Sequence, residues 1–177
     1  PYFLGKAFSQ GILFVKGQQF ENVQLKLNME KGQLILKETL INGIPVQLIV
    51  TPSLVDSFYI SHHFFINNTF ISNEIEKIGF MQQLFAGDLS LYRQQIKLFQ
   101  PKYSQLHPSG QYGVAEKKYY LITDSGLLEV NNKKAFLAFF GDNKRKVKRY
   151  MKQQSIRFKK ASDAQFYNLL KYCNELF

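Results

Sequence analysis

Short apolar runs separated by turn-forming residues fill most of this sequence, from residue 11 to residue 130. In the run 20–27, for example, apolar side chains alternate with Gln24 and Lys26. Alternation with a period of two predicts a β-strand that buries one face and leaves the other in water. Because no helix-length pattern lies between the runs, parallel crossovers have no room, and the strands are expected to be antiparallel neighbours.

Turn residues mark the ends of these strands. The segment 28–32 predicts a turn that ends at Gly32, and the dipeptide Asn42-Gly43 predicts a type I′ hairpin turn. The segment 100–115, with two prolines and two glycines, predicts an excursion loop. The expected strands are 12–16, 20–27, 34–36, 46–50, 57–66, 79–85, 89–99, 118–123 and 127–130.

After residue 130 the apolar spacing becomes that of a helix. Asn132 is expected to cap a first helix that Gly141 ends, and Asp142 is expected to cap a second. Ser162 followed by Gln165 fits the capping box of a last helix. The buried stripe of that helix is expected to be Phe166, Leu169, Leu170 and Cys173.

These patterns together predict an α+β fold that is mainly β. An antiparallel meander is expected to form a curved sheet, a roll or a barrel, with two to three C-terminal helices packed on it. The chain has 177 residues, of which 45% are hydrophobic, enough for one self-supporting domain over residues 1–177. Within it we expect an antiparallel β region over 1–130 and a basic helical region over 131–177.

Positive charge is concentrated near the end of the chain. Residues 133–160 contain eleven Lys and Arg and one acid, Asp142, which accounts for the whole net charge of +10. A local positive field predicts an anionic partner. The candidate anion-binding residues lie on the outer face of the second predicted helix: Lys144, Arg145, Lys148, Arg149 and Lys152. The competing interpretation is a solvated helix face without a partner.

Four tyrosines in and beside the strands from residue 89 to residue 120 are candidates for carbohydrate or peptide recognition, because the ring combines contact area with a hydroxyl. They are Tyr92, Tyr103, Tyr112 and Tyr119. The competing interpretation is that these rings pack in the core.

The sequence contains no recognisable catalytic or metal-binding pattern. If 57–66 is one strand, the side chains of His62 and His63 leave opposite faces and cannot ligate one metal, so a site would need a distant partner such as His107 or Glu74. Cys173 lies on an apolar helix stripe and is expected to be an inert core thiol. We therefore expect no enzymatic activity, no metal and no cofactor; an enzyme with its site in the loop 100–115 is the remaining alternative.

Several short segments resemble a group of uncharacterised exported proteins of Bacteroidetes. The matching segments are Gly11-Ile12-Leu13 with Lys16-Gly17, Val23-Gln24-Leu25-Lys26-Leu27-Asn28, Gly87 with Leu91-Tyr92, Lys118-Tyr119-Tyr120-Leu121, and Lys146-Val147-Lys148 with Tyr150. The resemblance implies an exported protein, periplasmic or extracellular, whose signal peptide is removed before Pro1. It carries over no catalytic residue.

The primary functional hypothesis is a non-catalytic exported protein of a bacterial envelope with a binding or structural role. Its expected partner is an anionic envelope component, either a lipid headgroup or an acidic glycan. The alternative hypothesis is binding of nucleic acid or another polyanion through the basic C-terminal helices. No run approaches the 18 uncharged apolar residues of a membrane-spanning helix, so the chain is not expected to span a membrane.

Overall fold

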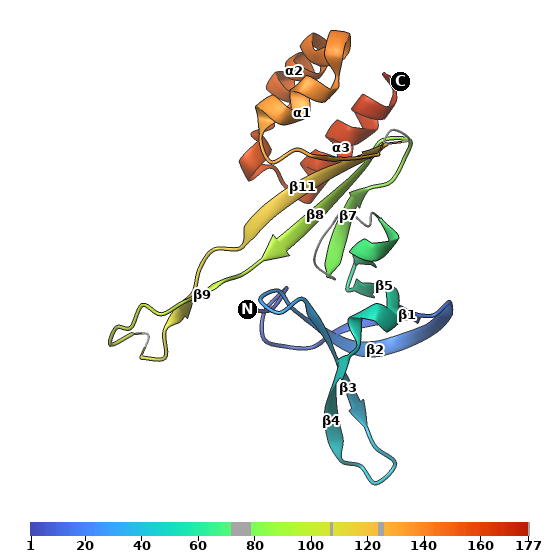
Figure 1. The fold of residues 1–177 in the computed structure, drawn as a ribbon, viewed down its shortest axis with the longest axis vertical. Helices are drawn as coiled ribbons and strands as arrows, with labels where there is room; N and C mark the ends of the chain where they lie inside the picture. Colours follow the sequence, from blue (N-terminus) through green and yellow to red (C-terminus); the bar gives the residue numbers. More distant parts are fainter. Residues whose placement is uncertain (72–78, 107, 124–125, 177) are drawn as a thin grey trace. The chain divides into compact units, whose positions relative to one another are not determined.

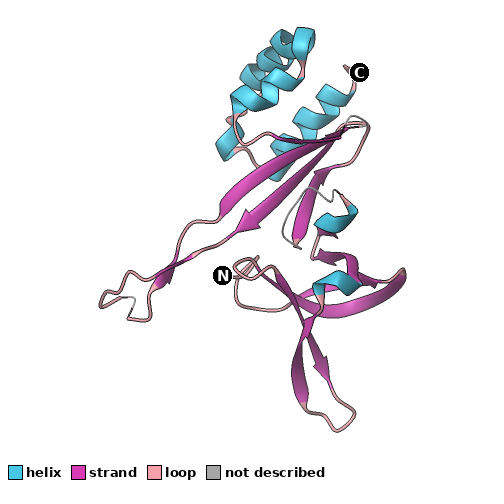
Figure 2. Ribbon diagram, viewed as in Figure 1, coloured by secondary structure: helices cyan, strands magenta, loops and turns pink. Residues whose placement is uncertain are grey.

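A computed structural model describes residues 1–71, 79–106, 108–123 and 126–176. Its strands are β1 (Ser9–Val15), β2 (Gln18–Asn28), β3 (Gln33–Thr39), β4 (Pro45–Val50), β5 (Val55–Ile60), β6 (His63–Asn67), β7 (Phe80–Phe85), β8 (Ser90–Ile96), β9 (Phe99–Gln100), β10 (Gln111–Tyr112), β11 (Glu116–Thr123) and β12 (Gly126–Glu129). Its helices are α1 (Lys133–Phe139), α2 (Lys144–Gln153) and α3 (Asp163–Asn174). Short 3-10 turns occupy Pro52–Leu54, Asn68–Phe70, Gly141–Asn143 and Phe158–Lys160 (Figure 2).

The predicted fold class is confirmed: an antiparallel sheet is followed by three C-terminal helices (Figure 1). Ten strands form the sheet in the order β12-β11-β8-β7-β6-β5-β1-β2-β3-β4. Across the described strands this order ends at β12 and at β4, so the sheet does not close into a barrel. The strands β9 and β10 form a separate two-stranded ladder within the predicted excursion loop.

The chain divides into two compact units, each with a core of its own. The first unit contains Pro1–Gln82 and Gln95–Glu116, and the second contains Gln83–Gln94 and Lys117–Phe177. The single domain with a division at residue 130 stays a prediction.

Residues of β1 to β3 and of β5 to β7 build the core of the first unit. The buried apolar side chains are Leu13, Val23, Leu25, Leu27, Leu34, Val55, Phe58, Ile60, Phe65 and Phe80. Gly11 is needed at the centre of this core, because a Cβ there would collide with the carbonyl oxygen of Tyr59 on β5. Its missing side chain therefore lets β1 and β5 pair closely.

Two turn predictions are wrong. The expected single strand 57–66 is the hairpin of β5 and β6, because Ser61 takes a left-handed φ of 54° and the chain reverses between Ile60 and His63. The turn between β3 and β4 is not type I′. Its loop has three residues between Leu40 and Ile44, and only Gly43 among them has a positive φ. A type I′ turn would need a positive φ at Asn42 as well. Instead the Asn42 side chain accepts a hydrogen bond from the backbone N–H of Ile44.

The three helices pack against β8 and β11 and bury the core of the second unit (Figure 1). The helix caps at Asn132 and Ser162 are confirmed, since each side chain accepts a backbone hydrogen bond and Ser162 and Gln165 form the capping box. The predicted cap at Asp142 is wrong. That residue lies in a 3-10 turn, and α2 begins after Asn143 without a side-chain cap.

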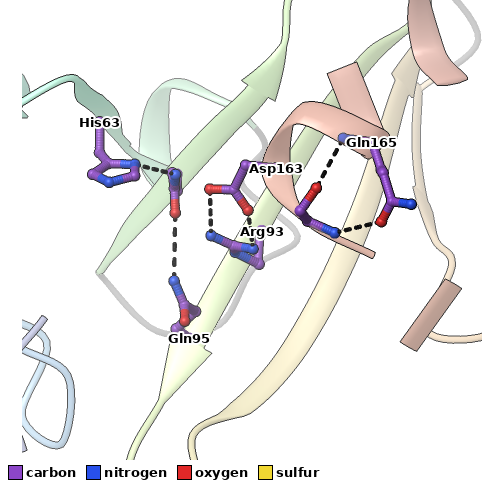
Figure 3. Close-up of polar contacts among 7 residues, drawn as sticks. His63, Arg93, Gln95, Asp163 and Gln165 are labelled. Atoms are coloured by element: carbon purple, nitrogen blue, oxygen red, sulfur yellow. Dashed lines mark hydrogen bonds and ion pairs between the residues drawn. The ribbon is translucent and has the colours of Figure 1, made fainter. Parts of the chain in front are cut away.

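An ion pair between buried Arg93 and partly exposed Asp163 fixes the first turn of α3 against β8. The Arg93 guanidinium donates two hydrogen bonds to the Asp163 carboxylate, Nη1 to Oδ1 at 2.6 Å and Nη2 to Oδ2 at 3.0 Å (Figure 3). Asp163 also lies in the first turn of α3, where a negative charge is favoured by the helix dipole. The four predicted stripe residues of α3 are fully buried beneath this contact: Phe166, Leu169, Leu170 and Cys173.

Candidate anion-binding site

Helix α2 separates an apolar face from a basic face. Val147 and Met151 are fully buried, and Tyr150 packs partly buried beside them. The exposed residues Arg145, Lys148, Arg149 and Lys152 follow the spacing i, i+3, i+4 and i+7, so they share the opposite face. Burial of the apolar side chains thus turns four of the five predicted anion-binding residues toward solvent together.

The chain reversal after α2 adds a further cation to this face. Ser155 takes a left-handed φ of 52°. Its N–H donates to the carbonyl of Lys152 at 3.1 Å, and the N–H of Ile156 donates to the carbonyl of Met151 at 2.8 Å. This pair of bonds is a Schellman motif, in which the residue after the turn packs on the last helical turn. The Ile156 side chain is accordingly buried in the core. The next residue, Arg157, lies beside the cations of α2.

Side chains from three segments line an open hollow of about 530 Å³, which we call the basic groove. Met151, Ser155 and Ile156 are its uncharged lining residues. Its cations are Lys133 at the start of α1, Arg145, Lys148, Arg149 and Lys152 on α2, and Arg157 after the turn. All six are exposed, and no described residue forms a salt bridge with any of them. None of the described residues that line the groove carries a carboxylate.

The charge at the start of α2 opposes helix stability. Lys144, Arg145 and Lys146 occupy its first turn, and the turn contains no acidic residue. The positive end of the helix dipole lies there, so each cation costs roughly 0.3–1 kcal/mol at low ionic strength. The helix dipole therefore does not favour this placement, and of the three cations only Arg145 lines the groove.

The groove contains two cations that the sequence analysis did not predict and leaves out one that it did. Lys144 is exposed but lies about 100° around α2 from Arg145 and does not line the groove. Lys133 and Arg157 were missed by sequence reasoning, because they are not on the helix that carries the basic stripe. The only sequence signal for them is their place in the basic run 133–160.

The lining residues are suited to binding rather than to covalent chemistry. Ammonium and guanidinium groups bind phosphate, sulfate and carboxylate groups, and Arg does so with two parallel hydrogen bonds. Among the described residues of the lining there is no His, Cys or carboxylate that could act as a general base. The same residues include no aromatic ring on which a base could stack.

The four candidate tyrosines do not gather on the groove. Tyr92 and Tyr119 are buried in the second unit, where Tyr119 packs against Phe158 and Phe166, and burial raises the pKa of both hydroxyls. Little of either ring is open to a ligand, since Tyr119 belongs to the core of the second unit and the buried Tyr92 hydroxyl accepts a hydrogen bond from Gln83 Nε2 at 2.7 Å.

The other two tyrosines belong to the first unit. Tyr103 is exposed in the loop before β10. The Tyr112 hydroxyl donates to Glu30 Oε2 at 2.9 Å, and this hydrogen bond raises the pKa of the tyrosine. Tyr112 also meets Phe99 edge to face, so its ring holds the β9–β10 ladder together.

The prediction that His62 and His63 point apart is wrong, because His62 lies in the turn between β5 and β6. The two rings lie 4.0 Å apart, and His63 Nδ1 shares a hydrogen bond of 2.9 Å with Gln82 Nε2 (Figure 3). His107 and Glu74 lie outside the described residues. Within the described residues no group of three His, Cys, Asp or Glu side chains could hold a metal ion.

Cys173 is fully buried, and burial raises its pKa to about 12. A thiol in that state is neutral and unreactive at physiological pH. In the part of the chain that the structure describes, no helix combines the length and the apolar character needed to cross a membrane.

Comparison of the chain with family models, with curated proteins and with solved structures gives no match. The functional argument therefore depends on the side chains of the basic groove. Their convergence from three segments on one hollow is the feature that a function has to explain.

Proposed function

We propose that this protein is a non-catalytic binding protein that holds a polyanion in its basic groove. The observation that carries the proposal is the convergence of six exposed cations on one hollow without a carboxylate among its lining residues. Exposed Lys and Arg scattered over a surface are ordinary. Cations from three segments that gather on one hollow are less readily explained by solvation alone, and Arg145 among them also opposes the dipole of its own helix.

An extended polymer matches the layout of the cations. Arg145 and Lys152 lie seven residues apart on one face of α2, a rise of about 10 Å along the helix axis. Successive charges on one strand of a duplex are about 3.4 Å apart along its axis, so this span matches about three charge-to-charge intervals of the polymer. Lys133 and Arg157 widen the site beside the stripe.

Two features favour recognition of the charged backbone of the polymer. No aromatic ring is present among the described lining residues, so these residues offer no base stacking as a means of recognition. None of the exposed large apolar side chains of the described chain lies on α1 or α2, so these helices carry nothing to insert between lipid tails. An acidic glycan or a nucleic-acid backbone fits both features.

We also propose export to a bacterial envelope, where an acidic glycan or an anionic headgroup surface is the natural polyanion. The support for this address is the resemblance of short segments such as Lys146-Val147-Lys148 to exported proteins of Bacteroidetes. Nucleic acid is the alternative ligand and requires a cytoplasmic location. Fractionation of the cells that make the protein separates the two, since an envelope fraction supports the first and a cytoplasmic fraction the second.

The test of binding is a titration with a heparin oligosaccharide, with neutral dextran as the matched uncharged polymer. The groove variant, Lys148→Gln with Arg149→Gln, removes two cations that line the hollow. The control variant, Lys134→Gln with Lys146→Gln, removes two exposed cations of α1 and α2 that do not line it. We expect saturable binding of heparin alone, weakened by at least about tenfold in the groove variant and by less than about threefold in the control.

Because the substituted side chains are exposed, both variants should keep the unfolding midpoint of the parent protein. Equal loss of affinity in both variants would show that net charge, and not the basic groove, attracts the polymer. The absence of saturable binding would reject the proposal.

A further inference from the structure

The strand β4 is one edge of the ten-stranded sheet, and its outer side is uncovered in the described structure. Its inner side pairs with β3 from Leu34↔Val50 to Thr39↔Pro45. The N–H of Leu40 donates to the carbonyl of Ile44 at 2.9 Å, so these two residues form a hydrogen-bonded pair. In an antiparallel ladder, hydrogen-bonded and non-hydrogen-bonded pairs alternate from one residue to the next. The backbone N–H and C=O groups of Gln47 and Ile49 therefore point away from β3.

Pro45, which has no backbone N–H, limits pairing at the start of β4, but the side chains from Val46 to Val50 leave the rest of this edge open. Its sequence, PVQLIV, contains no charged residue. Leu48 is 51% exposed and Ile49 is 61% exposed, and adjacent strand residues point to opposite faces, so the edge is apolar on both sides. Edge strands of proteins that stay monomeric are usually protected by an inward-pointing charge, a lysine or a bulge.

An apolar hollow of about 450 Å³ continues the surface beside β4. Side chains from β1 to β4 line it, among them Leu13, Val23 and Leu48. Glu38 is the one charged residue of its lining. An exposed apolar surface of this kind, next to open backbone groups, is suited to a further β-strand.

We propose that a second copy of this chain covers the edge, with the two β4 strands paired antiparallel about a two-fold axis. The distribution of charge favours contact between copies through the first unit, which contains β4. The first unit carries eight Lys and Arg against seven Asp and Glu, whereas the second carries fifteen against six. Two copies therefore meet without repulsion at the first unit, and β4 itself brings no charge to the contact.

The strand is also complementary to itself. Pairing centred on Leu48 places Gln47 of one copy opposite Ile49 of the other, and these are the residues whose backbone groups point outward. Each such pair forms two hydrogen bonds. The two Leu48 residues then face each other in a non-hydrogen-bonded pair, with a Cα–Cα distance of about 4.5 Å. An interface in which the same patch serves both copies is the usual form of a dimer.

The first test is the mass of the full chain in solution, by light scattering over a range of concentrations. We expect twice the chain mass of 20.6 kDa at high concentration. Ile49→Lys places one ammonium group of each copy at diagonal positions across the axis, about 7–8 Å apart, and should raise the dissociation constant of the dimer at least about tenfold. The matched control is Val114→Lys, which adds the same charge at a side chain that is 92% exposed and distant in sequence from β4.

The second test is a covalent one. Leu48→Cys brings two thiols to a separation at which a disulfide forms, since its usual Cα–Cα range is about 4.4–6.8 Å. Two thiols lose two electrons and two protons to an added oxidant such as oxidised glutathione, and one S–S bond forms. Cys173 is buried and does not compete. We expect a covalent dimer for Leu48→Cys at concentrations at which Val114→Cys stays monomeric.

A chain that keeps the monomer mass at every concentration overturns the proposal, whatever other molecule the edge binds. A dimer that Ile49→Lys does not weaken, or that Leu48→Cys does not trap, overturns it as well. Circular dichroism shows whether each variant keeps the strand content of the parent. Since β4 lies in the first unit and the basic groove in the second, neither outcome depends on polyanion binding.

Discussion

The salt dependence of binding gives the sharpest prediction for the basic groove. Each cation that contacts a phosphate releases a counterion, so the logarithm of affinity falls with the logarithm of salt concentration with a slope of about −0.9 per contact on duplex DNA. If all six groove cations make one contact each, the slope is about −5.4, and affinity falls about 2000-fold between 50 and 200 mM salt. DNA serves here as a polyanion of known charge density.

The groove variant removes two of these contacts. Its expected slope is about −3.6, which corresponds to a loss of about 150-fold over the same range of salt. The control variant, with Lys134→Gln and Lys146→Gln, should keep the parent slope, because neither side chain lines the groove. Fluorescence anisotropy of a labelled duplex at several salt concentrations measures all three slopes. Identical slopes for groove and control variants would refute the reasoning from the groove geometry.

Three further predictions concern the structure that supports the groove. Asp163→Asn removes the charge that pairs with buried Arg93 and should lower the free energy of unfolding by about 1–3 kcal/mol in urea denaturation. Asp142→Asn, at an exposed acid, is the control, and equal midpoints for the two variants would contradict the role of the ion pair. Ser155→Gly relieves the left-handed φ of 52° and should raise stability by about 0.5–1 kcal/mol; a lower midpoint than that of the parent is the contrary result. Cys173, whose burial raises its pKa to about 12, should react with a thiol reagent only after unfolding, and rapid modification of the native protein at neutral pH is incompatible with its place in the core.

Local signals in the sequence predicted local structure well. The cap at Asn132 and the box of Ser162 with Gln165 depend on contacts within four residues, and both are present. The alternation in β2 is local in the same sense. Asp142 failed as a cap because a 3-10 turn at Gly141–Asn143 joins α1 to α2 and takes up the residues that a cap needs.

Turns that depend on backbone conformation were harder to predict. Residues 57–66 were predicted as one strand because their strand-forming residue types continue through the turn between β5 and β6. Nothing in the sequence around Ser61 indicates that it adopts a positive φ. The basic groove shows the same limit. Its helical stripe follows from spacing alone, but Lys133 and Arg157 reach it through the packing of α1 and the turn at Ser155, which no periodicity encodes.

The most direct test of the central claim is a nuclear magnetic resonance titration of the isotope-labelled chain with a heparin oligosaccharide. Polyanion binding in the basic groove predicts saturable shifts of the backbone amides at the six cationic positions, Lys133, Arg145, Lys148, Arg149, Lys152 and Arg157, with Lys134 and Lys146 much less affected. Shifts spread evenly over every exposed lysine, or centred on a different part of the chain, would contradict the claim.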